Sequence, residues 1–239
     1  MENKVNYGID APGVIRNLFI AGIPLLILSL AFPFIKIGGL TIVIGWFIWP
    51  GSIFTAEGVL MLIYGFYGKF YHRDRILNLI SWTGNEQVLD VGTGKGLLMI
   101  GAAKRLTSGK STGIDIWNAE DLSGNNVQNT KKNAAIEGVA GKIDIKNQNV
   151  MEMEFADDTF DVILSNLCLH NIYNKEGRKT ACAEISRVLK SGGTAVISDF
   201  RHTRQYKNNF NALGLQATLL PANYFTTFPP LTILVVKKP

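Results

Sequence analysis

The chain has 239 residues, of which 47% are hydrophobic and 18% are charged, and its formal net charge is +5. This composition excludes a disordered chain, because disorder needs low hydrophobicity and high charge. Two cysteines are too few for a disulfide framework or a four-ligand zinc site. The positive excess is mild and scattered, which excludes the clustered basic face of a nucleic-acid-binding protein.

The charged residues divide the chain into two parts. Residues 1–70 contain only seven charged side chains, and the remaining 36 follow. Nineteen uncharged residues lie between Arg16 and Lys36, and another 20 lie between Lys36 and Glu57. About 20 apolar residues are enough to cross a ~30 Å hydrocarbon core. We therefore expect an N-terminal segment with a two-helix transmembrane hairpin over residues 1–70, followed by an α/β domain over residues 71–239.

The expected spans cover residues 12–34 and 40–70, with the turn at residues 36–39 and a kink near Pro50. Two alternatives stay open, namely a buried hairpin packed on the domain and three short spans broken at Pro50. Glu57 would lie within the second span, where a carboxylate costs about 2.5–3.5 kcal/mol. Glu57 is therefore expected to have a functional role, to lie near the membrane interface, or to extend its side chain toward that interface.

Basic residues flank the expected hairpin and are nearly absent from its turn. They are Lys4 and Arg16 before it, Lys69, Arg73 and Arg75 after it, and Lys36 in the turn. The positive-inside rule then places both ends of the hairpin, and the α/β domain, in the cytoplasm.

Strands alternate with helices after residue 71. The expected strands cover residues 87–91, 111–115, 142–147, 160–165 and 194–199, and the expected helices cover residues 75–82, 97–106, 125–137 and 178–189. This alternation predicts a parallel, doubly wound sheet. No helix is expected between residues 215–225 and 231–237, so these two runs predict an antiparallel hairpin that completes the sheet.

A glycine turn follows the first expected strand of the domain. Gly92, Gly94 and Gly96 let the backbone approach a ligand closely, and Asp90 precedes them by two residues. The dinucleotide fingerprint G-x-G-x-x-G would place its third glycine at the position of Leu97, so the spacing argues against a nicotinamide cofactor. The nearby carboxylate of Asp90 favours a cationic ligand instead.

Polar residues also end the next two strands, at the edge where parallel sheets bind ligands. Asp115 can accept hydrogen bonds from both hydroxyls of a ribose, and such charge-assisted bonds contribute about 1.5–3 kcal/mol each. Ile116 and Trp117 can cover an adenine face, while Asn149 and Val150 can meet the adenine edge.

Four motifs in this order resemble the class I S-adenosylmethionine-dependent methyltransferases over residues 73–239. They are the Asp90 glycine turn, Asp115, residues 160–166 (FDVILSN) and residues 184–193 (EISRVLKSGG). The resemblance implies a Rossmann-like, seven-stranded doubly wound sheet whose last strand is antiparallel. It implies S-adenosylmethionine as cofactor, held by Asp90, Gly92, Thr93, Gly94, Gly96, Asp115, Ile116, Asn149, Val150, Ser165 and Asn166. Asn149 and Ser191 depart from the family pattern, in which an acid and a proline stand at these positions.

Acceptor-side candidates follow the fourth and fifth strands of the domain. His170, Asp199 and His202 are expected as catalytic residues, because histidine exchanges protons near neutral pH. The alternatives are that His170 packs under the cofactor and that His202 caps a helix. A metalloid substrate is disfavoured, since of the two cysteines only Cys168 lies in a substrate loop, and no metal is expected.

Tyr7 and Asp10 precede the first expected span, and they either form a lid over the cofactor cleft or begin a helix, with Asp10 as its cap. Taken together, the sequence predicts a membrane-anchored methyltransferase for a small, lipophilic or membrane-delivered acceptor. The alternatives are a non-catalytic cofactor-binding membrane protein and, less favoured, an NAD-dependent oxidoreductase.

Overall fold

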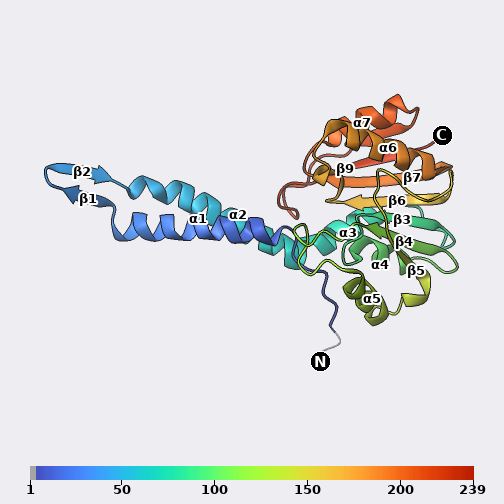
Figure 1. The fold of residues 1–239 in the computed structure, drawn as a ribbon, viewed down its shortest axis with the longest axis horizontal. Helices are drawn as coiled ribbons and strands as arrows, with labels where there is room; N and C mark the ends of the chain where they lie inside the picture. Colours follow the sequence, from blue (N-terminus) through green and yellow to red (C-terminus); the bar gives the residue numbers. More distant parts are fainter. Residues whose placement is uncertain (1–3) are drawn as a thin grey trace.

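The computed structural model describes residues 4–239, in which a long helical hairpin projects from an α/β domain (Figure 1). Residues 1–3 of the expected N-terminal segment lie outside the described residues. Helix α1 (Pro12–Ala31) begins with Pro12, whose missing N–H is not needed in a first helical turn. The second helical run is continuous from Gly45 to Leu77. It comprises η1 (Gly45–Phe47), α2 (Ile48–Ile63), one π-helical turn η2 (Tyr64–Gly68) and α3 (Lys69–Leu77).

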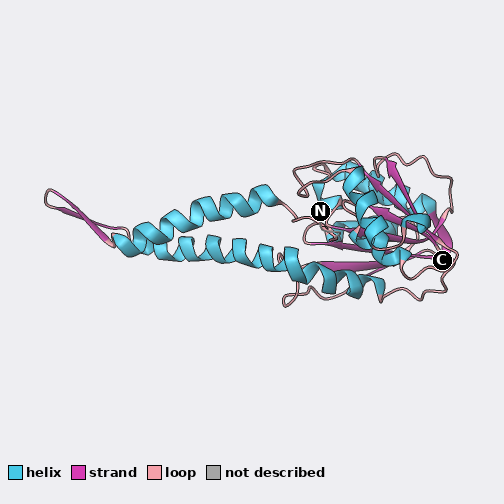
Figure 2. Ribbon diagram, turned by 90° about the horizontal axis from the view of Figure 1, so that it is seen from below, coloured by secondary structure: helices cyan, strands magenta, loops and turns pink. Residues whose placement is uncertain are grey.

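A short antiparallel β-hairpin joins the two helices at the far end of the projection (Figure 2). It consists of β1 (Phe34–Ile37) and β2 (Leu40–Val43) and turns at Gly38, whose φ of 60° suits glycine. The expected helix limits at residues 34 and 40 are therefore wrong, because both fall in strands. Pro50 lies in the first turn of α2, where an N–H has no helical partner, so it does not divide the second helix.

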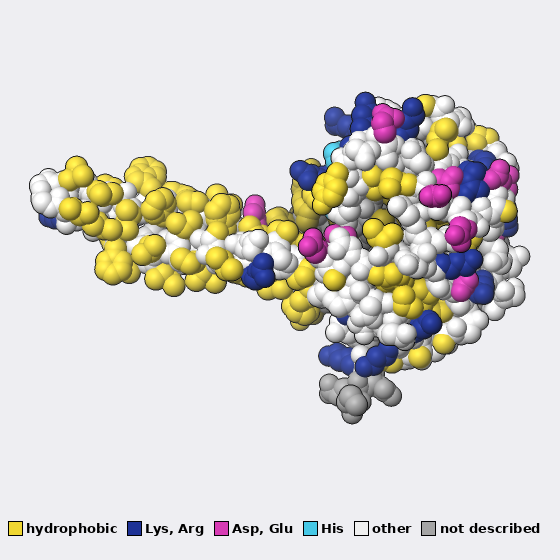
Figure 3. Space-filling view, viewed as in Figure 1, with side chains coloured by type: hydrophobic (Ala, Val, Ile, Leu, Met, Phe, Trp, Pro, Cys, Tyr) yellow, Lys and Arg dark blue, Asp and Glu magenta, His cyan; other side chains and the backbone are white. Residues whose placement is uncertain are grey.

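The helices of the hairpin pack closely through small residues. A Cβ atom on Gly22 would lie 2.5 Å from Thr55 Oγ1, and one on Gly51 would lie 2.8 Å from the Leu26 backbone nitrogen. On the face shown in Figure 3 the hairpin is mostly hydrophobic with few charged side chains, whereas most charged side chains gather on the domain. Among residues 4–239, two helices, Pro12–Ala31 and Gly45–Leu77, are long and apolar enough to cross a membrane.

The described part of the domain contains one seven-stranded sheet, in the order β5-β4-β3-β6-β7-β9-β8. Its strands are β3 (Gln87–Val91), β4 (Lys110–Asp115), β5 (Ile143–Asn147), β6 (Phe160–Asn166), β7 (Leu189–Asp199), β8 (Gln216–Leu219) and β9 (Thr232–Lys237). The last strand, β9, runs antiparallel to both of its neighbours, β7 and β8, as predicted. From β3 the chain passes outward to β4 and β5 and then returns to β6 on the other side of β3, which makes the β3/β6 boundary the switch point.

The helices that cover the sheet are α4 (Leu97–Ala103), α5 (Val127–Ile136), α6 (Lys175–Val188) and α7 (Thr203–Ala212), with short turns η3 (Ala140–Lys142) and η4 (Leu169–Asn171). A separate helix over residues 75–82 was expected, but α3 already ends at Leu77 and continues directly from the hairpin. Helix α7 was not predicted from the sequence. It is largely polar and buries only Tyr206 and Phe210, a single i, i+4 pair.

Candidate functional site

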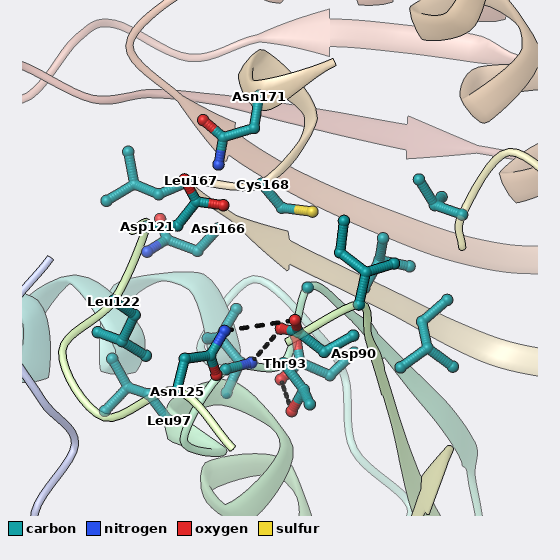
Figure 4. Close-up of a pocket in the computed structure, with 18 of the residues that line it drawn as sticks. Asp90, Thr93, Leu97, Asp121, Leu122, Asn125, Asn166, Leu167, Cys168 and Asn171 are labelled. Atoms are coloured by element: carbon teal, nitrogen blue, oxygen red, sulfur yellow. Dashed lines mark hydrogen bonds between the residues drawn. The ribbon is translucent and has the colours of Figure 1, made fainter. Parts of the chain in front are cut away.

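A cavity of about 350 Å³ opens at the carboxyl ends of β3, β4 and β6 (Figure 4). Its wall combines the loops after these strands with the N-terminal segment and the base of the second hairpin helix. Nine of the eleven residues that the sequence assigned to the cofactor line it: Asp90, Gly92, Thr93, Gly94, Asp115, Ile116, Asn149, Val150 and Asn166. This is the edge of a doubly wound sheet at which ligands bind.

Glycine is required in this turn both by the positive φ angles of its backbone and by close packing against neighbouring side chains. Gly92 has φ 71°, and a Cβ there would lie 2.3 Å from Cys168 Sγ. A Cβ on Gly94 would lie 2.8 Å from Leu122 Cδ2. Gly96 caps α4 with φ 87° but is outside the cavity wall, and its place in the binding set is therefore not supported by contact with the cavity.

Asp90 holds this turn in place by hydrogen bonds from within the core. Its side chain is 2% exposed and accepts hydrogen bonds from Thr93 Oγ1 at 2.8 Å and from the Met99 backbone N–H at 2.9 Å. Burial raises the pKa of the Asp90 carboxyl to about 7. The residue therefore changes charge near neutral pH at the floor of the cavity.

Asp115 ends β4 with its carboxylate toward the same turn. It accepts from the backbone N–H groups of Gly94 at 2.8 Å and Trp117 at 2.6 Å. Oδ1 also accepts from Asn125 Nδ2, at the long distance of 3.4 Å, so the free lone pair for a ligand hydroxyl is on Oδ2. The neighbouring Ile116 is 64% exposed and offers an apolar surface beside this carboxylate.

The loop after β5 supplies Asn149 and Val150 to the cavity. Asn149 Oδ1 accepts from the Met151 backbone N–H at 3.0 Å, which fixes the loop and leaves a second lone pair on that oxygen. Val150 is buried. Val150 can therefore contact the face of a flat base, and the amide group of Asn149 can meet its edge.

The side chains of the two residues that end β6, Ser165 and Asn166, have different surroundings. Asn166 lines the cavity, and its Oδ1 is buried without a hydrogen-bond partner within the described residues. Ser165 instead donates to the Val91 carbonyl oxygen at 3.0 Å and lies outside the cavity wall. Ser165 therefore ties β6 to β3, whereas Asn166 presents an unused acceptor to a ligand.

The three expected catalytic residues are not part of the cavity wall formed by residues 4–239. Asp199 is fully buried, with Oδ1 at 2.8 Å from His170 Nδ1 and Oδ2 accepting from the His170 backbone N–H at 3.0 Å. This pair fixes the η4 turn directly behind the cavity-lining Leu167 and Cys168. His202 is exposed at the start of α7 and has φ 61°, but its side chain makes no capping hydrogen bond.

The N-terminal segment, residues 5–11, crosses the mouth of the cavity, and we call it the strap. It runs along the loop after β4, where the Ile9 N–H donates to Ser123 Oγ at 2.8 Å and the Ala11 N–H donates to the Asp121 carbonyl oxygen at 2.9 Å. Tyr7 is 6% exposed and lines the cavity together with Asp10. The expectation that Asp10 caps α1 is wrong, because Ala11 occupies the cap position and no side chain bonds there.

Several cavity residues carry no motif that would identify them in the sequence. They are Lys69, Asp121, Leu122, Asn125 and Gln148. Lys95 belongs to the predicted glycine turn, and Leu167, Cys168, Asn171 and Tyr173 come from the loop after β6, where acceptor-side residues were expected. For Lys69 one signal existed, since it is the first cation after a long apolar run. The others come from loops whose path depends on the fold.

The donor set fits S-adenosylmethionine. Asp115 offers a carboxylate for the ribose hydroxyls, Ile116 and Val150 offer apolar surface for adenine, and Asn166 holds an unpaired acceptor. The glycine turn packs too closely against Cys168 and Leu122 for a Cβ, so its backbone itself lines the cavity. These features form one continuous cavity, as an adenosine joined to an amino acid requires.

Comparison with known proteins identifies the same domain. The family described as "Methyltransferase domain" matches residues 83–222. The Ubiquinone/menaquinone biosynthesis C-methyltransferase UbiE of Geotalea daltonii is 35% identical over 126 residues, covering 52% of this chain and 50% of that protein. The Demethylmenaquinone methyltransferase of Tropheryma whipplei (strain Twist) is 30% identical over 158 residues, covering 66% of this chain and 60% of that protein.

Solved structures share the fold at lower identity. A SAM dependent methyltransferase from Aquifex aeolicus superposes with a TM-score of 0.54 and 16% identity, over 69% of this chain and 88% of that one. The chain spans 50% to 60% of the length of the two curated relatives described above. The family match begins at residue 83, after the hairpin.

Proposed function

This chain belongs to the methyltransferase domain family, whose methyl donor is S-adenosylmethionine, and from that premise we propose that it methylates a small lipophilic acceptor supplied by a membrane. One observation carries the proposal. Both helices of the apolar hairpin end at the cavity, because the strap leads into α1 and Lys69 follows η2. An acceptor that moves along the hairpin therefore arrives at the site of transfer.

The hairpin has the properties of a membrane anchor. Helix α1 has 20 residues and is about 30 Å long, which matches a hydrocarbon core. Its glycine contacts with α2 are of the kind that lets membrane helices approach each other closely. With basic residues at the base of the hairpin and only Lys36 at its tip, two spans would hold the domain on the cytoplasmic side.

Aromatic side chains surround the base of the hairpin, as they do at membrane interfaces. Tyr67 and Tyr71 on the second helical run are 68% and 69% exposed, and Phe225 in the β8–β9 loop is 98% exposed. That loop lies against the helix, since a Cβ on Gly68 would be 2.3 Å from the Thr226 carbonyl oxygen. An interface at this level would place the cavity at the bilayer surface.

The acceptor class follows from the relatives and from the wall of the cavity. Two relatives are named for ubiquinone and menaquinone methylation, so we propose a quinol-like ring with an apolar tail. Leu97, Leu122, Leu167 and Ile172 give the cavity an apolar side that suits such a ring. His170 and Asp199 are then positioning residues that hold the η4 turn, and neither touches the acceptor.

The chemistry requires alignment more than activation. When bound, S-adenosylmethionine supplies a methyl group on a sulfonium, which is already a good leaving group. The chain holds the acceptor in line with that group and excludes water, and alignment of this kind can contribute about 7–11 kcal/mol. The match to the methyltransferase family argues against a non-catalytic cofactor-binding protein and against an oxidoreductase, and the G-x-G-x-G spacing also argues against the second.

The test uses the full chain in phospholipid vesicles with methyl-labelled S-adenosylmethionine. We expect label on a demethylated quinol that carries a prenyl tail and much less on the same ring without a tail. Asp115→Ala in the same vesicles is the matched control and should lose the reaction. Equal labelling of both acceptors would contradict delivery by the membrane, and labelling of neither would contradict the acceptor class.

A further inference from the structure

We propose that Lys69 and Asp10 bind the amino-acid end of S-adenosylmethionine, with the Lys69 ammonium on its carboxylate and the Asp10 carboxylate on its ammonium group. The inference rests on the proposed function for the identity of the cofactor. It assigns to the cofactor site two residues from the anchor region, which lies outside residues 83–222 that match the family.

Lys69 is a buried cation with unused hydrogen-bonding capacity. Its side chain is 4% exposed and lines the cavity. Nζ donates to the Tyr7 carbonyl oxygen at 3.2 Å and to the Gly8 carbonyl oxygen. An ammonium group has three N–H donors, so one remains for a ligand.

Asp10 is a carboxylate that lacks a donor within the described residues. Its Oδ2 is buried without a hydrogen-bond partner and lies 4.0 Å from Lys69 Nζ, which is too long for a hydrogen bond. A buried acceptor left unpaired is costly, more so when it is charged. Because Asp10 also lines the cavity, a bound ligand can supply the missing donor.

The two groups complement an α-amino acid, which carries an ammonium and a carboxylate on one carbon. The ligand carboxylate would accept the spare N–H of Lys69, and the ligand ammonium would donate to Asp10 Oδ2. Lys69 Nζ and Asp10 Oδ2 already face each other at 4.0 Å, and each would then gain a second opposite charge together with a hydrogen bond. An apolar group would leave Asp10 Oδ2 and the third N–H of Lys69 without a hydrogen-bond partner.

The position of the strap indicates which end of the cofactor lies next to Lys69 and Asp10. A Cβ on Gly8 would lie 3.1 Å from Lys95 Cδ and 3.0 Å from Leu122 Cδ1. The strap therefore crosses the glycine turn, whereas adenine is assigned to the β5 loop at Asn149. Since the amino-acid end is the part of the cofactor farthest from adenine, it falls under the strap.

Calorimetry on the full chain in detergent tests this assignment with two ligands. S-adenosylhomocysteine carries the amino-acid end, and 5′-methylthioadenosine has the same adenosine and thioether but lacks it. Lys69→Met and Asp10→Asn should each weaken S-adenosylhomocysteine about 10- to 100-fold and change 5′-methylthioadenosine less than about threefold. Lys69→Arg should restore part of the loss. Arg75→Met, on the same helix but outside the cavity, is the control and should change neither affinity.

Equal weakening of both ligands by Lys69→Met would overturn the proposal, because Lys69 would then act only by fixing the strap. An unchanged affinity for S-adenosylhomocysteine would overturn it as well. Failure of the wild-type chain to bind S-adenosylhomocysteine would refute the cofactor and this inference together. Binding without methylation of any quinol would refute only the proposed acceptor.

Discussion

Truncation of Asp115 is the sharpest test of the cofactor site. The carboxylate already accepts from the Gly94 and Trp117 N–H groups and, at 3.4 Å, from Asn125 Nδ2. We expect the ribose hydroxyls to take the free lone pair on Oδ2 and to replace the long Asn125 contact. Charge-assisted hydrogen bonds contribute about 1.5–3 kcal/mol each. Because water can partly replace a half-exposed carboxylate, we expect Asp115→Ala to cost about 2–4 kcal/mol, or about 30- to 700-fold in affinity for S-adenosylhomocysteine.

Titration calorimetry on the full chain in detergent measures this loss, and thermal melting checks that the fold persists. Glu120→Ala is the matched control, since Glu120 lies in the same loop but outside the cavity wall. An S-adenosylhomocysteine analogue without ribose hydroxyls completes a double-mutant cycle. It should bind the wild type weakly and lose little more in Asp115→Ala. A loss below about threefold for the natural ligand, or an equal loss for the analogue, would refute the assignment of Asp115 to the ribose.

Three further predictions follow from the same geometry. Gly92→Val should abolish cofactor binding in calorimetry, because its Cβ would lie 2.3 Å from Cys168 Sγ and the φ of 71° disfavours a side chain. Cys168→Ala should not restore binding, because Cys168 Cβ, at 2.5 Å, would remain. Since the pKa of Asp90 is about 7, its carboxylate becomes ionised as pH rises from 6 to 8. The preference for cationic S-adenosylmethionine over neutral-sulfur S-adenosylhomocysteine should therefore grow over this range, and Asp90→Asn should flatten the titration. Gly51→Leu should separate α1 from α2 and lower the thermal midpoint in detergent, whereas Gly39→Ala at the open turn should not. Unchanged melting of Gly51→Leu would argue against close helix packing.

The cofactor side could be predicted from sequence because its determinants are local. Gly92, Gly94 and Gly96 follow a buried strand at a spacing that fixes a left-handed turn, and Asp115 ends the next strand. The alternation of elements also predicted the parallel part of the sheet, although not helix α7. The antiparallel last strand was predicted because no helix was expected before residues 231–237.

The acceptor side and the anchor junction depend on contacts that no local pattern encodes. Lys69 and Asp10 are 59 positions apart and meet only because the hairpin returns its chain to the domain. His170 and Asp199 do come together, but behind the cavity, since the direction of the η4 turn is set by tertiary packing. Residues 34–43 are apolar enough for helix but form strands, because the chain must reverse at Gly38.

The most direct test of membrane delivery separates the protein and its acceptor into different vesicles. The full chain is reconstituted in one vesicle population, and a demethylated quinol with a long prenyl tail is placed either in the same vesicles or in a second population that does not exchange lipid. With labelled S-adenosylmethionine outside, the account predicts labelled quinol only when the protein and the acceptor share a bilayer. Equal labelling in both arrangements would contradict it.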